Sequence, residues 1–145
     1  MNYCLERLRM PVIEVDMLIA FVNVLDKYHK IASRLMDRIV TGKIRNVKVA
    51  ASAYLEYELI LRSRGYSEED IREDLYCFKN LANLGEVSLT VDVLLKASEL
   101  REKYGLTFFD SLHGATALLL DRMIISVDED YGKVEGLKVV NPAEI

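Results

Sequence analysis

Four carboxylates stand where apolar segments of the sequence begin or end. Asp16 follows the run PVIEV, and Glu56 lies shortly after the strand-like run VKVAAS. Asp110 opens an apolar helical segment, and Asp128 follows the run RMIISV. Carboxylate oxygens are the ligands that hard divalent cations prefer in proteins. We therefore expect these acids to share one metal site, where they act as metal ligands and as the catalytic groups.

Other acids compete for places near this site. Glu14 precedes Asp16 by two residues and is expected to contribute from the outer part of the site. Asp130, near the last of the four acids, is an additional candidate ligand. Glu58 lies two residues beyond Glu56, which is roughly 200° around a helix. Only one of these two glutamates is therefore expected to face the metal.

Taken singly, most of these acids also have a structural explanation. Asp110 stands three residues after Thr107, the spacing of a helix cap. Asp128 begins DEDYG, a sequence typical of a turn. Asp16 is harder to explain, because apolar residues surround it and a buried carboxylate needs a partner. A metal ion would be a suitable partner.

The histidines and the basic residues carry weaker signals. His113 follows Asp110 by three residues, and we expect it to pack in the core or to contact a metal ligand from outside. His113 and His29 do not form a metal-binding pair. Several basic side chains could contact phosphates, although such groups more often form solvated faces. These side chains are Lys43, Arg45, Lys48, Arg62 and Arg64.

Regular elements must position these side chains, and the hydrophobic pattern predicts strands that alternate with helices. Strand-like apolar runs cover residues 11–15, 47–52, 87–90, 122–127 and 137–140. Helical periodicity covers 17–24, 29–40, 53–64, 71–84, 91–104 and 107–121. This alternation is typical of a parallel sheet covered on both faces, so we expect an α/β fold, a three-layer α/β/α sandwich. Ligands bind beyond the carboxyl ends of such strands, where the four acids can meet.

Length and composition narrow the class of protein. The 145 residues fit a single domain, and the hydrophobic share of 51% predicts a packed core. A net charge of −4 argues against binding nucleic acid mainly through a basic surface, but bound cations would supply positive charge to a nuclease. We see no membrane span and no secretory signal. Cys4 and Cys77 lack metal-site spacing, so we expect reduced thiols in a cytoplasmic protein.

Other phosphate chemistries would leave signatures that this sequence lacks. There is no GxxxxGKS or GxxxxGKT loop, and no GxGxxG follows the first strand. Asp16 is followed at the second position by Leu18 rather than by another acid, which disfavours an aspartyl-phosphate phosphatase. No Ser/His/Asp or Cys/His arrangement offers itself for covalent catalysis.

The order of these segments resembles the PIN domain, a nuclease family that includes VapC-type toxins. The resemblance runs from about residue 10 to residue 142 and is most specific in TFFDSLHGATALLLDRMIISVDEDY. It matches the acids of the family, in order, to Asp16, Glu56, Asp110 and Asp128. Ser126 matches a hydroxyl residue two positions before the last acid, whereas Leu18 replaces the Ser or Asn of many members. Residues 1–9 precede the usual start of such domains, as an N-terminal extension or because translation starts at Met10.

The resemblance implies a parallel sheet of about five strands and carboxylates that bind Mg²⁺ or Mn²⁺. It also implies endonucleolytic cleavage of RNA, a homodimer and, if the protein is the toxin of a toxin–antitoxin pair, an antitoxin protein as partner. The alternative is a non-catalytic scaffold or dimerisation module in an RNA-processing assembly. Mutually repelling carboxylates count against this alternative, because a structural role gives no reason to gather them.

Overall fold

The computed structural model describes residues 9–145, so the expected extension at residues 1–9 lies outside the described chain except for Arg9. Cys77 is an exposed free thiol, and Cys4 also lies outside this range. Strands, α-helices and two 3₁₀ helices (η) follow in the order β1 (Val12–Ile13), α2 (Val15–Val22), α3 (His29–Val40), β2 (Lys48–Ala50), α4 (Ala51–Ser63), α5 (Glu68–Lys79), β3 (Gly85–Val87), α6 (Val91–Tyr104), α7 (Phe108–Leu119), β4 (Met123–Ile125), η1 (Glu129–Lys133), β5 (Lys138–Val140) and η2 (Pro142–Glu144).

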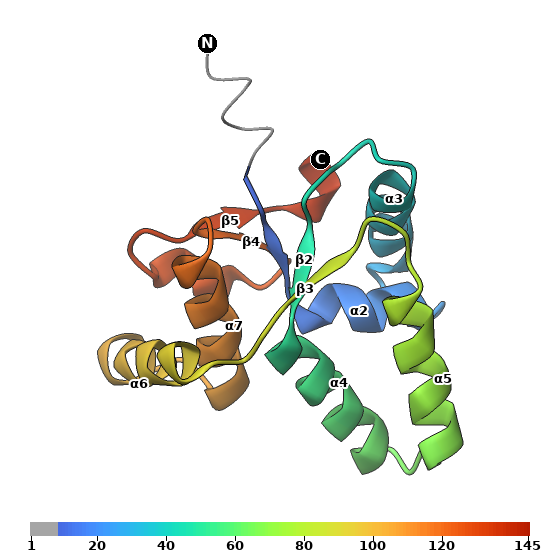
Figure 1. The fold of residues 1–145 in the computed structure, drawn as a ribbon, viewed down its shortest axis with the longest axis horizontal. Coiled ribbons are helices and arrows are strands. Elements are labelled where there is room, and N and C mark those ends of the chain that lie inside the picture. The colour runs from blue at the N-terminus through green and yellow to red at the C-terminus, as the bar shows by residue number, and fades with distance from the viewer. Residues whose placement is uncertain (1–8) are drawn as a thin grey trace.

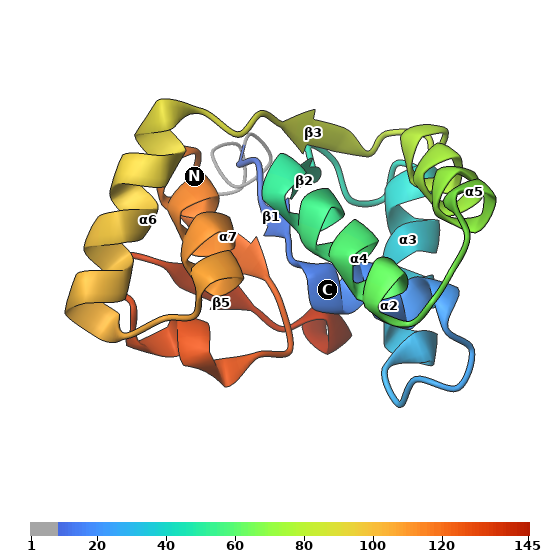
Figure 2. The same cartoon turned by 90° about the horizontal axis from the view of Figure 1, so that it is seen from below.

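The strands form one five-stranded parallel sheet in the order β3-β2-β1-β4-β5. Helices α6 and α7 lie on one side of this sheet, and α2, α3 and α5 lie on the other (Figure 1). Helix α4 continues directly from β2, and the view from below shows it between these two groups (Figure 2). The expected three-layer α/β/α sandwich with a parallel sheet is confirmed.

The central strands consist of apolar residues because both of their faces are covered. Val12 and Ile13 of β1, Val49 of β2, and Ile124 and Ile125 of β4 are each at most 1% exposed. Helix α3 contributes an apolar stripe to the same core, since Ala32, Leu35, Met36 and Ile39 recur at helical spacing and are buried. These apolar elements position the strand ends rigidly.

The first strand ends earlier than the run PVIEV predicts. Strand β1 stops at Ile13, and helix α2 begins at Val15. Glu14 is the N-cap of that helix, and its Oε2 accepts a hydrogen bond from the backbone N–H of Asp16 at 3.2 Å. A cap of this kind satisfies one of the free N–H groups at the start of a helix. Because Glu14 is the cap, the helix begins at Val15 and the chain leaves the sheet one residue after β1. The expectation that Asp16 ends a strand is therefore wrong.

Other boundaries also differ from the predicted ones, by a few residues at β2, α4, α7 and β4 and by more at β3 and α5. Strand β3 covers Gly85–Val87 rather than 87–90, because Thr90 caps helix α6 through a hydrogen bond from the backbone N–H of Val93. Helix α5 ends at Lys79 instead of continuing to residue 84. Asn83 has a φ of 67°, a left-handed conformation that is incompatible with a continuous helix.

Side-chain caps define the starts of α5 and α7, the second of them at the predicted Thr107. Ser67 and Asp70 form a complete capping box at the start of α5. The Thr107 side chain accepts a hydrogen bond from the backbone N–H of Asp110, which places Asp110 in the first turn of α7. None of the helices in residues 9–145 combines the length and the apolar character needed to cross a membrane.

Candidate metal centre

The acidic side chains meet at the edge of the sheet where the parallel strands end. Glu14 follows β1 directly, Glu56 lies in α4 just after β2, and Asp128 lies just after β4. Helix α7, which packs against β1, β2 and β4, brings Asp110 to the same edge. The side chains named in the sequence therefore come together around the carboxyl ends of the three central strands.

Ser126 links the acids that follow β1 and β4. Its Oγ donates a hydrogen bond to Asp16 Oδ2 at 2.8 Å and accepts one from the backbone N–H of Asp128 at 2.9 Å. The backbone N–H of Val127 donates to the same Asp16 oxygen at 2.9 Å. The second oxygen, Asp16 Oδ1, is buried and has no hydrogen-bond partner among the described residues. A buried carboxylate oxygen without a donor is a suitable ligand for a cation.

Glu14 is more central to the cluster than its predicted outer position implies. Its side chain is buried, and its Oε2 lies 3.3 Å from Ser126 Oγ. Burial, reinforced by the negative charge of Asp16 and more weakly by that of Asp110, raises the pKa of Glu14 to about 10. Glu14 therefore holds a proton at neutral pH unless a cation replaces it.

Three aspartates form the more open part of the cluster. Asp110, Asp128 and Asp130 each offer a carboxylate oxygen, and these oxygens lie within 4.8 Å of one another. Burial raises the pKa of Asp110, and the nearby charge of Asp128 raises it further. The buried Tyr131 hydroxyl donates a hydrogen bond to Asp110 Oδ1 at 3.2 Å. Burial and the surrounding acids raise the pKa of Tyr131, so its hydroxyl stays a donor.

The geometry decides between the two glutamates of α4. Glu56 Oε1 lies 2.7 Å from His113 Nε2, and ligand atoms of Glu14, Glu56 and His113 lie within 4.8 Å of one another. Glu58 instead binds Arg62 at 3.3 Å on the protein surface. Glu56 thus faces the acidic cluster, and Glu58 faces away from it.

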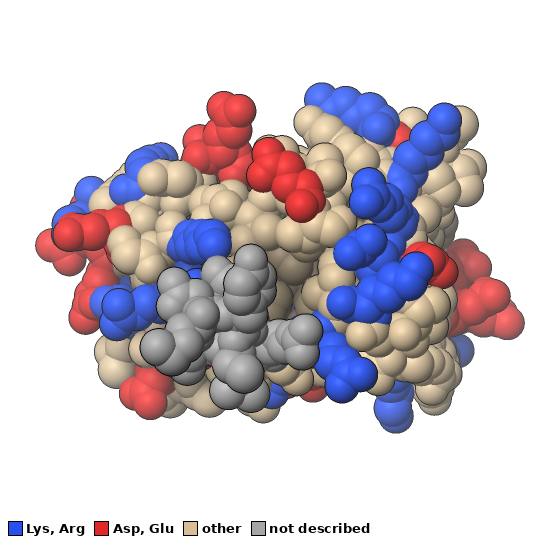
Figure 3. All heavy atoms as spheres, turned by 90° about the horizontal axis from the view of Figure 1, so that it is seen from above, with Lys and Arg blue, Asp and Glu red and all other residues tan. Residues whose placement is uncertain are grey.

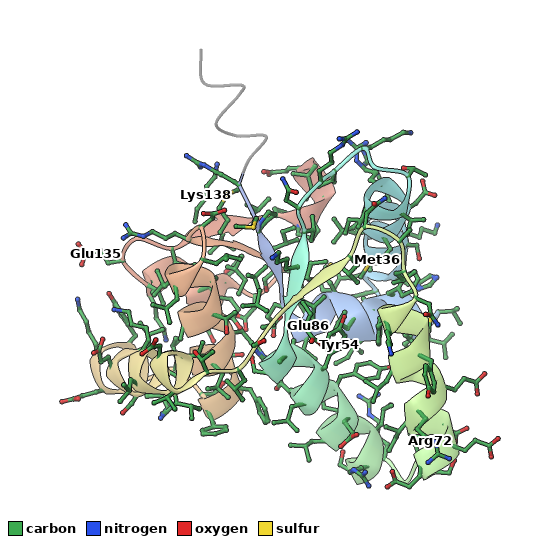
Figure 4. The ribbon with its side chains drawn as sticks, viewed as in Figure 1. Met36, Tyr54, Arg72, Glu86, Glu135 and Lys138 are labelled. Carbon is green, nitrogen blue, oxygen red and sulfur yellow. The ribbon has the colours of Figure 1, made fainter. Side chains whose placement is uncertain are left out.

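Glu86 of β3 is a further acid near α4. Figure 4 shows its side chain next to Tyr54. Burial, together with the charge of Glu86, raises the pKa of Tyr54 to about 12. Tyr54 therefore remains neutral and adds no charge to the region.

The cluster fits a hard divalent cation. Its potential metal ligands are mainly carboxylate oxygens, which Mg²⁺ and Mn²⁺ prefer. One of these oxygens, Asp16 Oδ1, is buried and has no hydrogen-bond partner among the described residues. Burial and mutual repulsion raise the pKa values of Glu14 and Asp110. The positive charge of a bound cation would stabilise the ionised carboxylates and so offset both effects. His113 Nε2 is already hydrogen-bonded to Glu56, so His113 supports the cluster from outside, in agreement with its expected role as packing or supporting residue.

Two contributors had no role assigned from the sequence. Tyr131 lies in the DEDY segment, and the sequence around it does not indicate that its hydroxyl bonds to Asp110. Ser52 is buried and lies 2.8 Å from His113 Nδ1. A signal for Ser52 exists in its spacing, since it precedes Glu56 by four residues and therefore shares its helix face.

Comparisons with known proteins show what this chain is similar to. The family model described as PIN domain matches residues 13–137. No curated protein sequence matches this chain.

Solved structures that share the fold include the following three. A toxin–antitoxin complex from Klebsiella pneumoniae is 18% identical with a TM-score of 0.65 and aligns over 93% of this chain and 99% of that chain. VapBC2 from Rickettsia felis, bound to a promoter DNA fragment, is 14% identical with a TM-score of 0.70 and aligns over 91% of this chain and 98% of that chain. VapC20 from Mycobacterium tuberculosis, a sarcin-ricin loop cleaving toxin, is 17% identical with a TM-score of 0.67, over 83% and 92%. Identities this low establish similarity of fold alone.

Proposed function

Because the chain belongs to the PIN domain family, we propose that it is a metal-dependent endoribonuclease that hydrolyses phosphodiester bonds of RNA. The observation that carries this proposal is that acids from separate elements lie close together, with Asp16 Oδ1 buried and without a hydrogen-bond partner among the described residues. A metal site of this composition needs no covalent intermediate with the protein.

Each acid has a distinct part in this proposal. Residues that would hold the cation, directly or through water, are Asp16, Glu56, Asp110 and Asp128, with Glu14 and Asp130 as further ligands. When bound, Mg²⁺ or Mn²⁺ supplies an activated water and stabilises the negative charge on the scissile phosphate. Ser126 and Tyr131 keep the aspartate carboxylates oriented by donating hydrogen bonds to them.

The charge distribution explains why a cation is required for RNA binding at this site. The chain has a net charge of −4, and the site itself is acidic. Figure 3 views the opposite end of the molecule, where the strands begin, and shows Lys and Arg gathered on the side that carries α3 and α5. The acidic cluster by itself repels a phosphate, so bound metal would supply positive charge near it.

Substitution of two ligands tests this proposal. Asp16→Asn and Asp110→Asn should each lower the rate of cleavage of a labelled RNA in Mg²⁺ or Mn²⁺ by roughly 100-fold, the scale of losing one group that stabilises transition-state charge. Asp37→Asn is the matched control, because Asp37 is an exposed residue of α3. Cleavage that resists EDTA and is undiminished in both variants would overturn the proposal, and failure of the wild-type protein to bind Mn²⁺ in calorimetric titration would favour a scaffold role.

We also propose that the protein is the cytoplasmic toxin of a toxin–antitoxin pair and forms a homodimer. Large apolar side chains on its surface support burial in an assembly, since Leu25 is 90% exposed and Val24 is 72% exposed. Co-expression with the product of the adjacent gene should yield a stable complex in which RNA cleavage is inhibited. Light scattering should give twice the mass of one chain for the protein alone. RNA cleavage that is not inhibited after co-expression, together with the mass of a single chain in light scattering, would contradict this part of the proposal.

A further inference from the structure

A buried chain of hydrogen bonds extends inward from the acidic cluster. His113 is completely buried, and its two ring nitrogens contact two different side chains. Nε2 lies 2.7 Å from Glu56 Oε1, and Nδ1 lies 2.8 Å from the hydroxyl of Ser52. Ser52 is itself only 1% exposed. The imidazole is thus fixed at both ends within the protein interior.

The chain of hydrogen bonds connects α4 with α7. Ser52 and Glu56 lie four residues apart on α4, so both side chains point from the same helix face toward α7. His113 comes from α7, one turn after Asp110, and the ring of Phe109 stacks on it with a centroid distance of 6.1 Å. Helix α7 therefore supplies one acid of the cluster and also restrains another acid that belongs to α4.

The partners of His113 determine which ring nitrogen carries the proton. A carboxylate only accepts hydrogen bonds, so Nε2 must donate to Glu56 and Nδ1 must accept from the Ser52 hydroxyl in the neutral ring. His29 has the opposite arrangement. Its Nδ1 lies 2.8 Å from the carbonyl oxygen of Ala20, which only accepts, and its Nε2 lies 3.3 Å from Ser33 Oγ. The hydrogen-bond partners of the two rings therefore call for opposite tautomers when the rings are neutral.

We infer that His113 is a positioning residue, oriented by Ser52, that holds the Glu56 carboxylate in place to bind the cation. This inference rests on the proposed metal-dependent function. The Glu56 side chain is 21% exposed and its ligand atom lies within 4.8 Å of one from Glu14. Without a donor, repulsion and side-chain entropy would favour its rotation into solvent. The donor engages Oε1 only, and no described residue donates a hydrogen bond to Oε2, which is free for a metal ion.

Metal affinity of the full-length protein, measured by calorimetric titration with Mn²⁺, tests the inference. His113→Leu should weaken Mn²⁺ binding by about tenfold or more, the scale for losing a residue that orients a ligand. His113→Gln should recover most of the affinity, because its amide can still donate to Glu56. Ser52→Ala should fall between the two. His29→Gln and Ser33→Ala are matched controls, since they alter the other Ser–His pair, which bonds to the carbonyl of Ala20 rather than to an acid, and should bind Mn²⁺ like the wild type.

A double variant separates positioning from packing. If His113 acts through Glu56, then adding His113→Leu to Glu56→Gln should cause no further loss of Mn²⁺ affinity. Additive losses would show that His113 affects the metal by another route and would overturn the inference. Circular dichroism and thermal melting identify any variant that fails to fold. If His113→Leu is one of these, Ser52→Ala and His113→Gln decide the outcome.

Nitrogen NMR of the metal-free protein gives a readout that does not depend on activity. The chain has only two histidines, so a His29→Gln sample leaves the His113 ring as the single imidazole signal. Its spectrum should show a proton on Nε2, the nitrogen that faces Glu56. A His113 ring without a proton on Nε2 would overturn the inference. Wild-type protein without Mn²⁺ affinity would refute the proposed function and this inference together, whereas wild-type affinity in all His113 and Ser52 variants would refute the inference alone.

Discussion

Glu56 and Glu58 are chemically identical residues two positions apart on α4, and their surroundings differ completely. Glu56 is hydrogen-bonded to the buried His113 beside the acidic cluster, whereas Glu58 forms a surface ion pair with Arg62. An exposed ion pair of this kind contributes little to stability, because water and salt screen it. Function at this position thus depends on the direction in which one side chain leaves the helix.

The same isosteric substitution at the two positions measures this difference. Glu56→Gln should weaken Mn²⁺ binding and slow RNA cleavage by about tenfold or more, since it removes a charged ligand that a neighbouring donor orients. Glu58→Gln should leave both quantities unchanged. Calorimetric titration and a cleavage assay on the two purified variants are sufficient. Equal losses in both variants would mean that α4 presents a different face to the cluster.

At the scale of elements, α7 carries much of the site, and its first turn is well defined. Helix α6 ends at Gly105, which has a φ of 67°, and Thr107 then caps α7. Glycine adopts this left-handed conformation without strain, so the connection between the helices is short. Further along α7, a Cβ on Gly114 would lie 3.6 Å from Leu100 Cδ1 and 3.7 Å from Tyr131 Cε1, which are ordinary contacts.

These two glycines should respond in opposite ways to replacement by alanine. Gly114→Ala should stabilise the protein by up to about 1 kcal/mol, because glycine is a poor helix former and the added methyl group meets no obstacle. Gly105→Ala should destabilise it by about 1 kcal/mol, because alanine is strained at positive φ. Thermal and chemical unfolding of both variants measures the effects. A destabilised Gly114→Ala variant would indicate tighter packing between α6, α7 and Tyr131.

The whole molecule gathers carboxylates at one edge of its sheet, so folding concentrates negative charge. Burial and neighbouring acids raise the pKa of Glu14 to about 10 from 4.5, and the pKa of Asp110 is also raised. A raised carboxyl pKa means that the folded protein binds more protons than the unfolded chain between the two values. The free energy of unfolding of the metal-free protein therefore decreases as pH rises through this interval.

This linkage predicts how pH and metal act together. The melting temperature of the metal-free protein should fall between about pH 5.5 and about pH 9, and Mn²⁺ should raise it more at the higher pH, where fewer protons compete for the carboxylates. Glu14→Gln should reduce the dependence on pH, because it removes the most strongly shifted group. Melting curves with EDTA and with Mn²⁺ provide the measurement. A metal-free protein that becomes more stable across this range would contradict the prediction.

Several elements could be predicted from the sequence because their signals are local. Helices α3 and α6 have the predicted bounds, since apolar periodicity and nearby cap residues are properties of a short segment. The start of α2 could not be predicted from the run PVIEV, because its β-branched residues favour a strand and glutamate is not among the residues that favour an N-cap. The helix prevails because α2 packs against α3 and α4, which lie outside this run of the sequence.

The amino-acid sequence by itself determined the α/β class and the positions of Asp16, Glu56, Asp110 and Asp128 at the edges of apolar segments. Only the tertiary structure decided that Glu14 is buried and that Ser52, His113 and Glu56 form a chain of hydrogen bonds. The reason is physical. Periodicity and capping depend on neighbours within a few residues, whereas burial and hydrogen-bond partnership depend on side chains that are far apart in the sequence, such as Glu56 and His113.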